Sequence, residues 1–395
     1  YSDSGNRAPR QTGGGIAVRS TSAQQQQRRT ASHGAFIIVA RSEGNPMGSA
    51  LFSPFTMRGM TLENRIVVSP MCQYSAIDGT AQDWHLVHLG QFAMSGVGLL
   101  ITEATAVEPR GRITPQCLGL YSDANEAALK RVLNFCRAHG SAKLGIQLAH
   151  AGRKASAHRP WEGRHPLTAE EGAWQTVSSS DLPHDAGWPR PLALDYDEMQ
   201  RIKTAFVNAT IRANRLGFDM LESHSAHGYL LHEFLSPIAN RRQDNYGGSL
   251  ENRLRFPLEV FQAMRAVWPV HKPLGVRLST TDWLAGGWAP DDAVVYARAL
   301  KKLGCDYITA SSGGISEQQQ IKLGPGYQVD FAAKIRQEAA LPSMAVGMIF
   351  DPQHAEDLVT EGSADMVALG RGLLFDPHWA WTAAATLGSQ VTPPP

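Results

Sequence analysis

The sequence lacks several features that mark whole classes of protein. Its four cysteines lie far apart and form no C-x-x-C pair, which argues against a zinc site or an iron–sulfur cluster and is typical of reduced, intracellular thiols. Basic residues number 37 and acidic residues 36, so no excess of positive charge is present to attract nucleic acid or an anionic membrane. No apolar run approaches the roughly 18 residues of a membrane-spanning helix. We therefore expect a small-molecule partner, with no nucleic acid and no membrane.

The first 46 residues contain too little apolar sequence to form a packed core. They include several arginines, a run of glutamines and only two acids, Asp3 and Glu43. Residues 1–46 are predicted to be a disordered leader or, because they are rich in Arg and poor in acids, an organellar transit segment. The folded domain is predicted to cover residues 47–395. The expected location is the cytoplasm, or the matrix of a plastid or mitochondrion if the leader is a transit peptide.

After residue 47, short apolar segments alternate with helical patterns. Eight of these segments are rich in β-branched residues, at 65–70, 97–104, 143–149, 218–224, 274–279, 305–311, 342–347 and 365–370. Apolar runs of this length are typical of parallel strands buried on both faces. Capping residues such as Ser122 and Gly140 mark the ends of the helices between them. Eight strand–helix units in one domain predict an α/β fold, a single (β/α)8 TIM barrel, and disfavour a doubly wound sheet.

The ends of the predicted strands carry polar and unusual residues, as expected for a barrel, whose binding and catalytic residues lie at the C-terminal ends of the strands. Gly347 and Gly370 follow the seventh and eighth strands, where backbone N–H groups commonly bind a phosphate, and Arg371 adds a fixed cation. Alternatively, both glycines only form tight turns. No strand is followed by G-x-G-x-x-G, so a resident dinucleotide on a Rossmann module is not expected.

The fourth predicted strand runs into the stretch FDMLESHSAHGYLL, residues 218–231, which brings His224, His227 and Tyr229 together. Two histidines three residues apart could bind a metal, serve only the structure, or contact a substrate. A metal site needs further ligands, and no third ligand is evident, so no metal is predicted. The spacing alone leaves the other two roles open.

Several long motifs resemble those of the Old Yellow Enzyme family, in particular its thermophilic-like branch. These motifs are SPMCQYSAIDG, EATAVEPRGRIT, GIQLAHAGRKAS, SAHGYLLHEFLSP, NRRQDNYGGSLENR, PGYQVDFAAKIR and ALGRGLLFDP, between about Leu51 and Trp381. The resemblance implies an NADPH dehydrogenase of the ene-reductase type, with noncovalent FMN and with NADPH or NADH as transient reductant. The implied reaction transfers hydride by way of FMN to the activated C=C bond of an α,β-unsaturated carbonyl or nitro compound. A homodimer or a homotetramer is left open.

The resemblance also assigns roles to individual residues. In the family's H-x-x-H-x-Y pattern the histidines hydrogen-bond the substrate oxygen and the tyrosine donates a proton, which implies these roles for His224, His227 and Tyr229. Cys72 is implied to tune the flavin and touch the substrate, which Tyr74 would flank. The implied FMN contacts are Ser69, Pro70, Met71, Cys72, Ala104, Gln147, Arg277, Gly347, Gly370 and Arg371. From the residues alone, Cys72 could also be a small buried hydrophobe and Arg277 a structural arginine.

Two further features bear on the site. Ser223 stands where the family usually has an aliphatic residue, and it is expected to loosen the packing beside His224. Residues 152–197 contain several prolines and tryptophans but no convincing helix, and so long a loop is predicted to form part of the active-site rim, with Lys154 near the mouth. The alternatives to an ene-reductase are a barrel lyase or aldolase that acts on a phosphorylated substrate and a flavin-binding protein without turnover.

Overall fold

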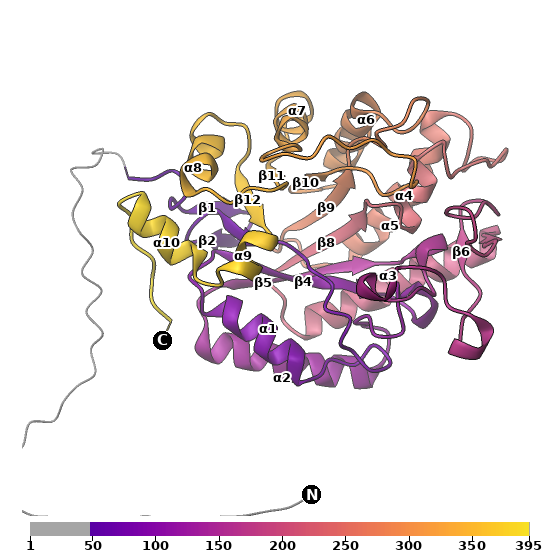
Figure 1. Cartoon of the computed structure of the whole chain (residues 1–395). Coiled ribbons are helices and arrows are strands. Elements are labelled where there is room, and N and C mark those ends of the chain that lie inside the picture. The colour runs from indigo at the N-terminus through magenta and orange to yellow at the C-terminus, as the bar shows by residue number, and fades with distance from the viewer. Residues whose placement is uncertain (1–47, 395) are drawn as a thin grey trace, which may run out of the picture. The chain divides into compact units, whose positions relative to one another are not determined.

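The computed structural model describes residues 48–394, and its centre is a closed barrel of eight parallel strands (Figure 1). The strands are β3 (Ile66–Val68), β4 (Leu99–Ala106), β5 (Lys143–Ala149), β8 (Met220–Ser225), β9 (Leu274–Ser279), β10 (Ile308–Ser311), β11 (Ser343–Ala345) and β12 (Met366–Leu369). Their order around the barrel is β10-β11-β12-β3-β4-β5-β8-β9. Each predicted apolar segment overlaps one of these strands, and the predicted (β/α)8 TIM barrel is confirmed. The predicted leader, residues 1–46, lies outside the described residues.

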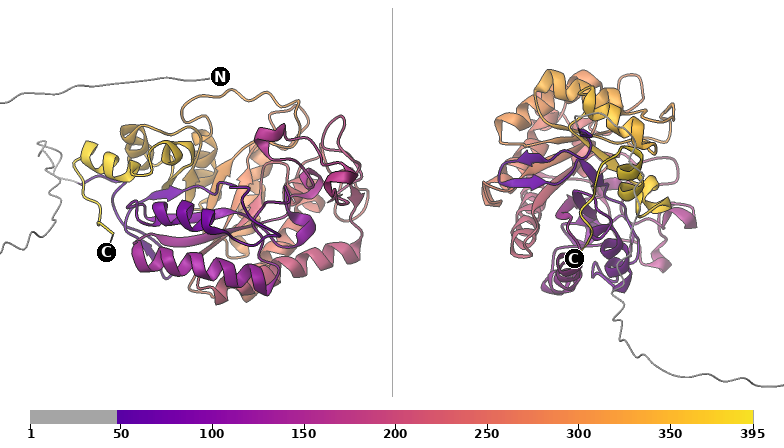
Figure 2. Two further views of the ribbon diagram at one scale, coloured as in Figure 1. Left: turned by 60° about the horizontal axis from the view of Figure 1, so that its bottom comes forward. Right: turned by 90° about the vertical axis from the view of Figure 1, so that its left-hand side faces the viewer.

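Helices surround the barrel (Figure 2). They are α1 (Asp83–Ala93), α2 (Asp123–His139), α3 (Tyr196–Arg215), α4 (Leu230–Leu235), α5 (Leu250–Val267), α6 (Pro290–Lys302), α7 (Val329–Ala339), α8 (Pro352–Thr360), α9 (Arg371–Phe375) and α10 (Trp379–Thr386). The Ser122 side chain starts α2 by accepting a hydrogen bond from the backbone N–H of Asn125. Among residues 48–394, no helix has the length and apolar character needed to cross a membrane.

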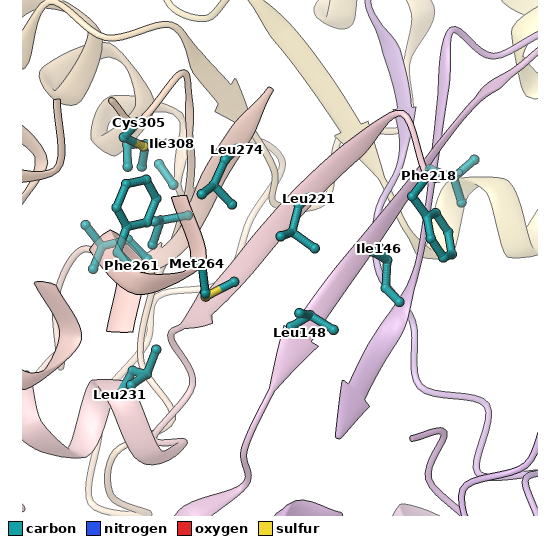
Figure 3. Close-up of a cluster of buried hydrophobic side chains, with 14 of the residues drawn as sticks. Ile146, Leu148, Phe218, Leu221, Leu231, Phe261, Met264, Leu274, Cys305 and Ile308 are labelled. Atoms are coloured by element: carbon teal, nitrogen blue, oxygen red, sulfur yellow. The ribbon is translucent and has the colours of Figure 1, made fainter. Parts of the chain in front are cut away.

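Apolar side chains on the outer faces of the strands pack against the helices. Every residue of β4 is buried, as expected for a parallel strand that is covered on both sides. Figure 3 shows part of this layer, where Leu221 of β8, Leu274 of β9 and Ile308 of β10 lie near Phe261 and Met264 of α5. Because each fully buried side chain of this kind contributes about 1.5–3 kcal/mol, this layer fixes the strands on which the site is built.

A second apolar cluster fills the barrel at the N-terminal ends of its strands. A short antiparallel hairpin, β1 (Phe55–Met57) and β2 (Met60–Leu62), lies at this end (Figure 1). Its buried side chains pack against interior side chains of the strands. The cluster comprises Met57, Met60, Leu62, Val67, Leu99, Ile101, Met220, Tyr307, Met344, Met366 and Ala368. The hairpin therefore closes one end of the barrel.

Residues 152–195, which we call the rim segment, connect β5 to α3. They contain short 3₁₀ turns and a pair of two-residue strands, β6 (Val177–Ser178) and β7 (Leu192–Ala193), but no α-helix. A long loop without a convincing helix was predicted here and is observed. The segment lies at the end of the barrel opposite the hairpin (Figure 1).

Candidate active site

A cavity of about 510 Å³ opens at the C-terminal ends of the barrel strands. Most of the residues predicted for the site line this cavity. They are Ser69, Met71, Tyr74, His227, Tyr229, Arg277, Gly347, Gly370 and Arg371. Of the other predicted residues, Pro70 and Cys72 flank Met71 in the chain, and Ala104 lines a small cavity that also touches Tyr229. His224 and Gln147 lie deeper, and their contacts are described below.

The end of β8 brings the two predicted histidines and the tyrosine into direct contact. The ring of His224 meets the rings of His227 and Tyr229 edge to face, with centroids 5.0 Å away in both cases. His224 Nδ1 accepts the backbone N–H of Ala226 at 3.2 Å, so in the neutral ring the proton resides on Nε2. Burial, with the charge of Arg277 next in importance, holds the pKa of both histidines well below its ordinary value. Both rings are therefore neutral and donate through one N–H each.

The backbone of His227 is held in an unusual conformation. Its φ of 60° lies in the left-handed region, which non-glycine residues rarely adopt. Its N–H donates to Ser279 Oγ at 2.9 Å, and its carbonyl accepts from Lys154 Nζ at 2.9 Å. Its Nε2 lies 2.7 Å from Ser311 Oγ. These contacts come from three other parts of the barrel, so the ring position is set by the fold and not by the local chain.

The next residue, Gly228, is fixed by a completely buried pair that the sequence did not suggest. The Gly228 N–H donates to His232 Nδ1 at 2.9 Å, and His232 Nε2 lies 3.0 Å from Asp282 Oδ1. Although burial opposes ionisation of Asp282, hydrogen bonds from His232 and Ser236 hold the pKa of this carboxyl below its usual range. A side chain at Gly228 would come within 2.0 Å of the Gly314 carbonyl oxygen. The pair therefore positions the turn that carries His227 and Tyr229.

A layer of polar side chains lies inside the barrel below the cavity. Glu222 of β8 accepts hydrogen bonds from Gln147 Nε2 at 2.8 Å and from Thr309 Oγ1 at 2.5 Å. Burial raises the pKa of Glu222, and the nearby charge of Arg277 opposes this. Among the described residues, no ion pair joins Glu222 to Arg277. Arg277 therefore lies near a buried acid but does not form an ion pair with it, as a structural arginine would.

The cavity wall around Arg277 fits a flavin. Arg277 Nη1 donates to Ser69 Oγ at 2.9 Å, whereas its buried Nε finds no partner within residues 48–394. A guanidinium that still has an unpaired N–H can stabilise the negative charge that reduced flavin carries on its ring. At the predicted phosphate site, a side chain at Gly347 would come within 3.1 Å of Gln328 Nε2 and 3.2 Å of the Tyr327 ring. The position therefore has little room for a side chain, and glycine leaves the backbone accessible. Six of the ten predicted FMN contacts thus line one cavity, namely Ser69, Met71, Arg277, Gly347, Gly370 and Arg371.

Cys72 and Tyr74 follow the end of β3, and Tyr74 lines the cavity. Burial, reinforced by Cys117 and Glu103, raises the pKa of the Cys72 thiol well above its ordinary value, so it stays protonated. Tyr74 has a φ of 51°, and its ring meets Trp161 of the rim segment edge to face at 5.6 Å between centroids. The rim segment therefore forms part of the cavity wall, as predicted.

Lys154 occupies the position near the mouth that was predicted for it. Its Nζ donates to the carbonyl oxygens of His227 at 2.9 Å and Gly314 at 2.8 Å and lies 5.3 Å from the centre of the Tyr229 ring. Ser223 is buried in β8, and because side chains alternate along a strand, it points to the opposite face from Glu222 and His224.

No role in the site was predicted for His232, Asp282 or Glu222, and Ser311 was expected only as one of the polar residues at the strand ends. His232 and Asp282 are fifty positions apart in the sequence, and only the fold brings them together. The one available signal was that His232 lies within the motif SAHGYLLHEFLSP, three residues after Tyr229. No group of three or more His, Cys, Asp or Glu side chains capable of holding a metal ion occurs among residues 48–394.

Comparison with known proteins agrees with this geometry. The NADH:flavin oxidoreductase / NADH oxidase family matches residues 50–390. NADPH dehydrogenase of Geobacillus thermodenitrificans is 43% identical over 350 residues, which cover 88% of this chain and 97% of the relative. NADPH dehydrogenase of Bacillus subtilis is 42% identical over 350 residues, with 88% and 98% covered.

A solved structure of morphinone reductase is also similar. It superposes with a TM-score of 0.72 at 28% identity and covers 88% of this chain and 91% of its own. A second structure, morphinone reductase in complex with tetrahydroNAD, gives a TM-score of 0.70 at 28% identity. These similarities favour a flavin oxidoreductase over the alternative lyase or aldolase. The chain belongs to the NADH:flavin oxidoreductase / NADH oxidase family, the Old Yellow Enzyme family, and is an oxidoreductase that uses FMN and NAD(P)H.

Proposed function

We propose that the protein is an ene-reductase, which reduces the activated C=C bond of an α,β-unsaturated carbonyl or nitro compound with Tyr229 as proton donor. The observation that carries this proposal is the contact of His224, His227 and Tyr229 at one wall of the cavity. FMN, when bound in the cavity, supplies the hydride chemistry between NAD(P)H and the alkene. The residues of the chain then bind the substrate oxygen and deliver a proton.

The two imidazoles supply hydrogen-bond donors to the substrate oxygen. His224 has its proton on Nε2 because Nδ1 accepts a backbone N–H. His227 Nε2 lies 2.7 Å from Ser311 Oγ, and because the Ser311 hydroxyl can donate to Gln328 Oε1, 3.5 Å away, Nε2 can carry the proton and offer it to a substrate oxygen. Negative charge accumulates on that oxygen during hydride addition, so donors that are already in place stabilise the transition state more than the bound substrate.

Tyr229 is suited to donate a proton and then recover it. Burial, with Cys72 and Cys117 next, raises the pKa of its hydroxyl, so it stays protonated until a strongly basic carbon forms beside it. The Lys154 ammonium over the face of its ring favours the tyrosinate that donation leaves behind. The proton thus moves only after charge has developed on the substrate.

Two sequential mixing experiments test the proposal. The FMN-loaded enzyme is first mixed with NADPH under argon, and the flavin absorbance is expected to bleach. Cyclohexenone is then added, and the absorbance is expected to return with formation of cyclohexanone, which carries deuterium at the carbon next to the carbonyl when the solvent is D2O. Bleaching without recovery for cyclohexenone and for a nitroalkene would refute the proposal and would leave a flavoprotein with another acceptor.

A further inference from the structure

The cavity wall carries an excess of positive charge. The charged side chains among its lining residues are Lys154, Arg164, Arg277 and Arg371, and no Asp or Glu lines it. The FMN phosphate and ring account for Arg371 and Arg277. Lys154 and Arg164 remain, at the side of the cavity that holds the proposed substrate residues Tyr74 and Tyr229.

Arg164 is the more unusual of the two cations. It lies in the rim segment with a φ of 53° and contributes to the cavity wall. Within residues 48–394, its guanidinium makes no hydrogen bond or ion pair to an acid. Its charge acts on the hydroxyls of Tyr74 and Tyr229, whose pKa it lowers against the effect of burial. Arg164 is exposed to solvent and lines the same cavity as Tyr74 and Tyr229.

The acids near Arg164 are already engaged by other partners. Glu162 pairs with Arg159, and Glu171 lies 3.1 Å from His158 Nε2. Glu317, across the mouth, lies 3.3 Å from His184 Nε2. None of these three carboxylates makes an ion pair with Arg164.

Lys154 offers a second donor from the opposite direction. Its ammonium has three N–H groups, and two of them are used by the carbonyls of His227 and Gly314. The third is available to a ligand in the cavity. Carbonyl oxygens orient an ammonium without neutralising it, and the acids that act on Lys154, Glu317 and Glu233, form no ion pair with it among residues 48–394.

We propose, on the basis of the proposed ene-reductase function, that the alkene substrate also carries a carboxylate, which binds between Arg164 and Lys154. A charge-assisted hydrogen bond in a partly desolvated pocket is stronger than a neutral one, and a guanidinium can bind a carboxylate through two N–H groups. The hydride donor is also an anion, but a ribose separates its phosphates from the reacting ring. Lys154 touches the residue that protonates the alkene, so its counter-ion belongs to the alkene substrate.

The test compares two substrates that differ only in charge. One is a cyclohexenone that carries a carboxylate on a three-carbon arm, and the other is its methyl ester. For the unmodified enzyme, kcat/KM for the acid is expected to exceed that for the ester by about fivefold to tenfold. Sodium chloride should reduce this ratio, because exposed charges are screened by salt. The saturated acid should likewise inhibit more strongly than the saturated ester.

Three variants assign the preference to Arg164. Arg164→Gln is expected to bring the acid-to-ester ratio close to one, and Arg164→Lys to keep most of it. Arg190→Gln is the matched control, because Arg190 lies on the same segment but is paired with Asp181 and does not line the cavity. It should keep the full ratio. Bound FMN is measured for each variant to confirm that the barrel is folded.

The outcomes separate this inference from the proposed function. If the ester is reduced as well as the acid, or if Arg164→Gln keeps the full ratio, the carboxylate site is wrong while the ene-reductase stands. If Arg164→Gln only slows flavin reduction by NADPH, the two cations serve the phosphates of the hydride donor, and the inference is again overturned. If neither the acid nor the ester is reduced, nor any simple enone or nitroalkene, the proposed function itself has failed.

Discussion

The two walls of the cavity are held in place by different interactions. At the end of β8, the turn that carries His227 and Tyr229 is fixed by buried hydrogen bonds, including that from Gly228 to His232, which in turn contacts the fully buried Asp282. The outer part of the rim segment instead carries exposed ion pairs, such as Arg159 with Glu162 and Arg190 with Asp181. Exposed pairs contribute little and weaken in salt, whereas breaking a buried pair is costly. The fixed wall suits the chemical step, and the rim suits the choice of substrate.

The largest effect is expected from the residue of the fixed wall that donates the proton. Tyr229→Phe should slow reoxidation by cyclohexenone about a hundredfold to ten-thousandfold, the usual range for general acid catalysis. Reduction by NADPH should keep its rate, because it requires no proton from this hydroxyl. Stopped-flow absorbance measures both phases. Equal slowing of the two phases would show that Tyr229 positions its neighbours and is not the donor.

The buried contacts that position the β8 turn can be removed by a substitution at His232, which does not line the cavity. His232→Phe removes the acceptor of the Gly228 N–H and leaves Asp282 buried without its partner, so the free energy of unfolding should fall by about 3–5 kcal/mol. Denaturant unfolding measures this change. Reoxidation by the alkene should also slow, and His232→Gln, whose amide can both accept and donate, should recover part of the rate.

His139→Phe serves as the control, because His139 is exposed at the end of α2 and should change neither quantity. A loss of stability in His232→Phe with an unaltered reoxidation rate would make His232 structural only.

Lys154 lies in the rim segment and donates a hydrogen bond to the His227 carbonyl on the fixed wall. Loss of its proton is expected to make the choice of substrate depend on pH. Burial, assisted by Arg164 and Arg153 and opposed by Glu317 and Glu233, lowers the pKa of Lys154 to about 8 from an ordinary 10.5. The cation is present below about pH 8 and lost above it, so the acid-to-ester ratio should fall by about twofold to threefold as pH rises through 8. Rate profiles from pH 6.5 to 9.5 test this. A decline that persists in Lys154→Met would assign the titration to another group.

The same shift also affects stability. The folded protein releases this proton at about pH 8, while the unfolded chain holds it up to about 10.5. Between these values the unfolded state binds more protons, so this group makes the folded state more stable as pH rises.

The smallest effect is expected in the rim. Asp181→Asn removes an exposed ion pair with Arg190 and should change the free energy of unfolding by less than about 0.5 kcal/mol. Denaturant unfolding beside His232→Phe gives the direct contrast. A loss as large as that of the buried pair would contradict the distinction between the two walls.

The sequence was informative where function depends on neighbours in the chain. Apolar runs predicted each barrel strand, and because strand ends of a barrel share one face, Ser69, Gln147, Arg277 and Gly347 could be placed together before any coordinates. Contacts between distant segments could not be predicted in this way. Nothing in the sequence pairs His232 with Asp282, because a helix and a loop after a different strand meet only through packing.

The rim shows the same limit for a different reason. Its sequence has no periodic pattern, so composition predicted that a loop would be present but not which side chain would reach the cavity. Arg164 and Arg159 are similar in sequence context, and only the observed contacts show that one is paired with Glu162 while the other faces the cavity.

The hairpin closes the barrel at the N-terminal ends of its strands, so the cavity is closed at that end. Met57, Met60 and Leu62 fill the far end, so within residues 48–394 the cavity opens at the C-terminal ends of the strands. NAD(P)H and the alkene are then expected to bind in the same cavity, so each must leave before the other binds. Turnover should follow alternating occupancy, with parallel lines in double-reciprocal plots, and an excess of either partner should obstruct the other.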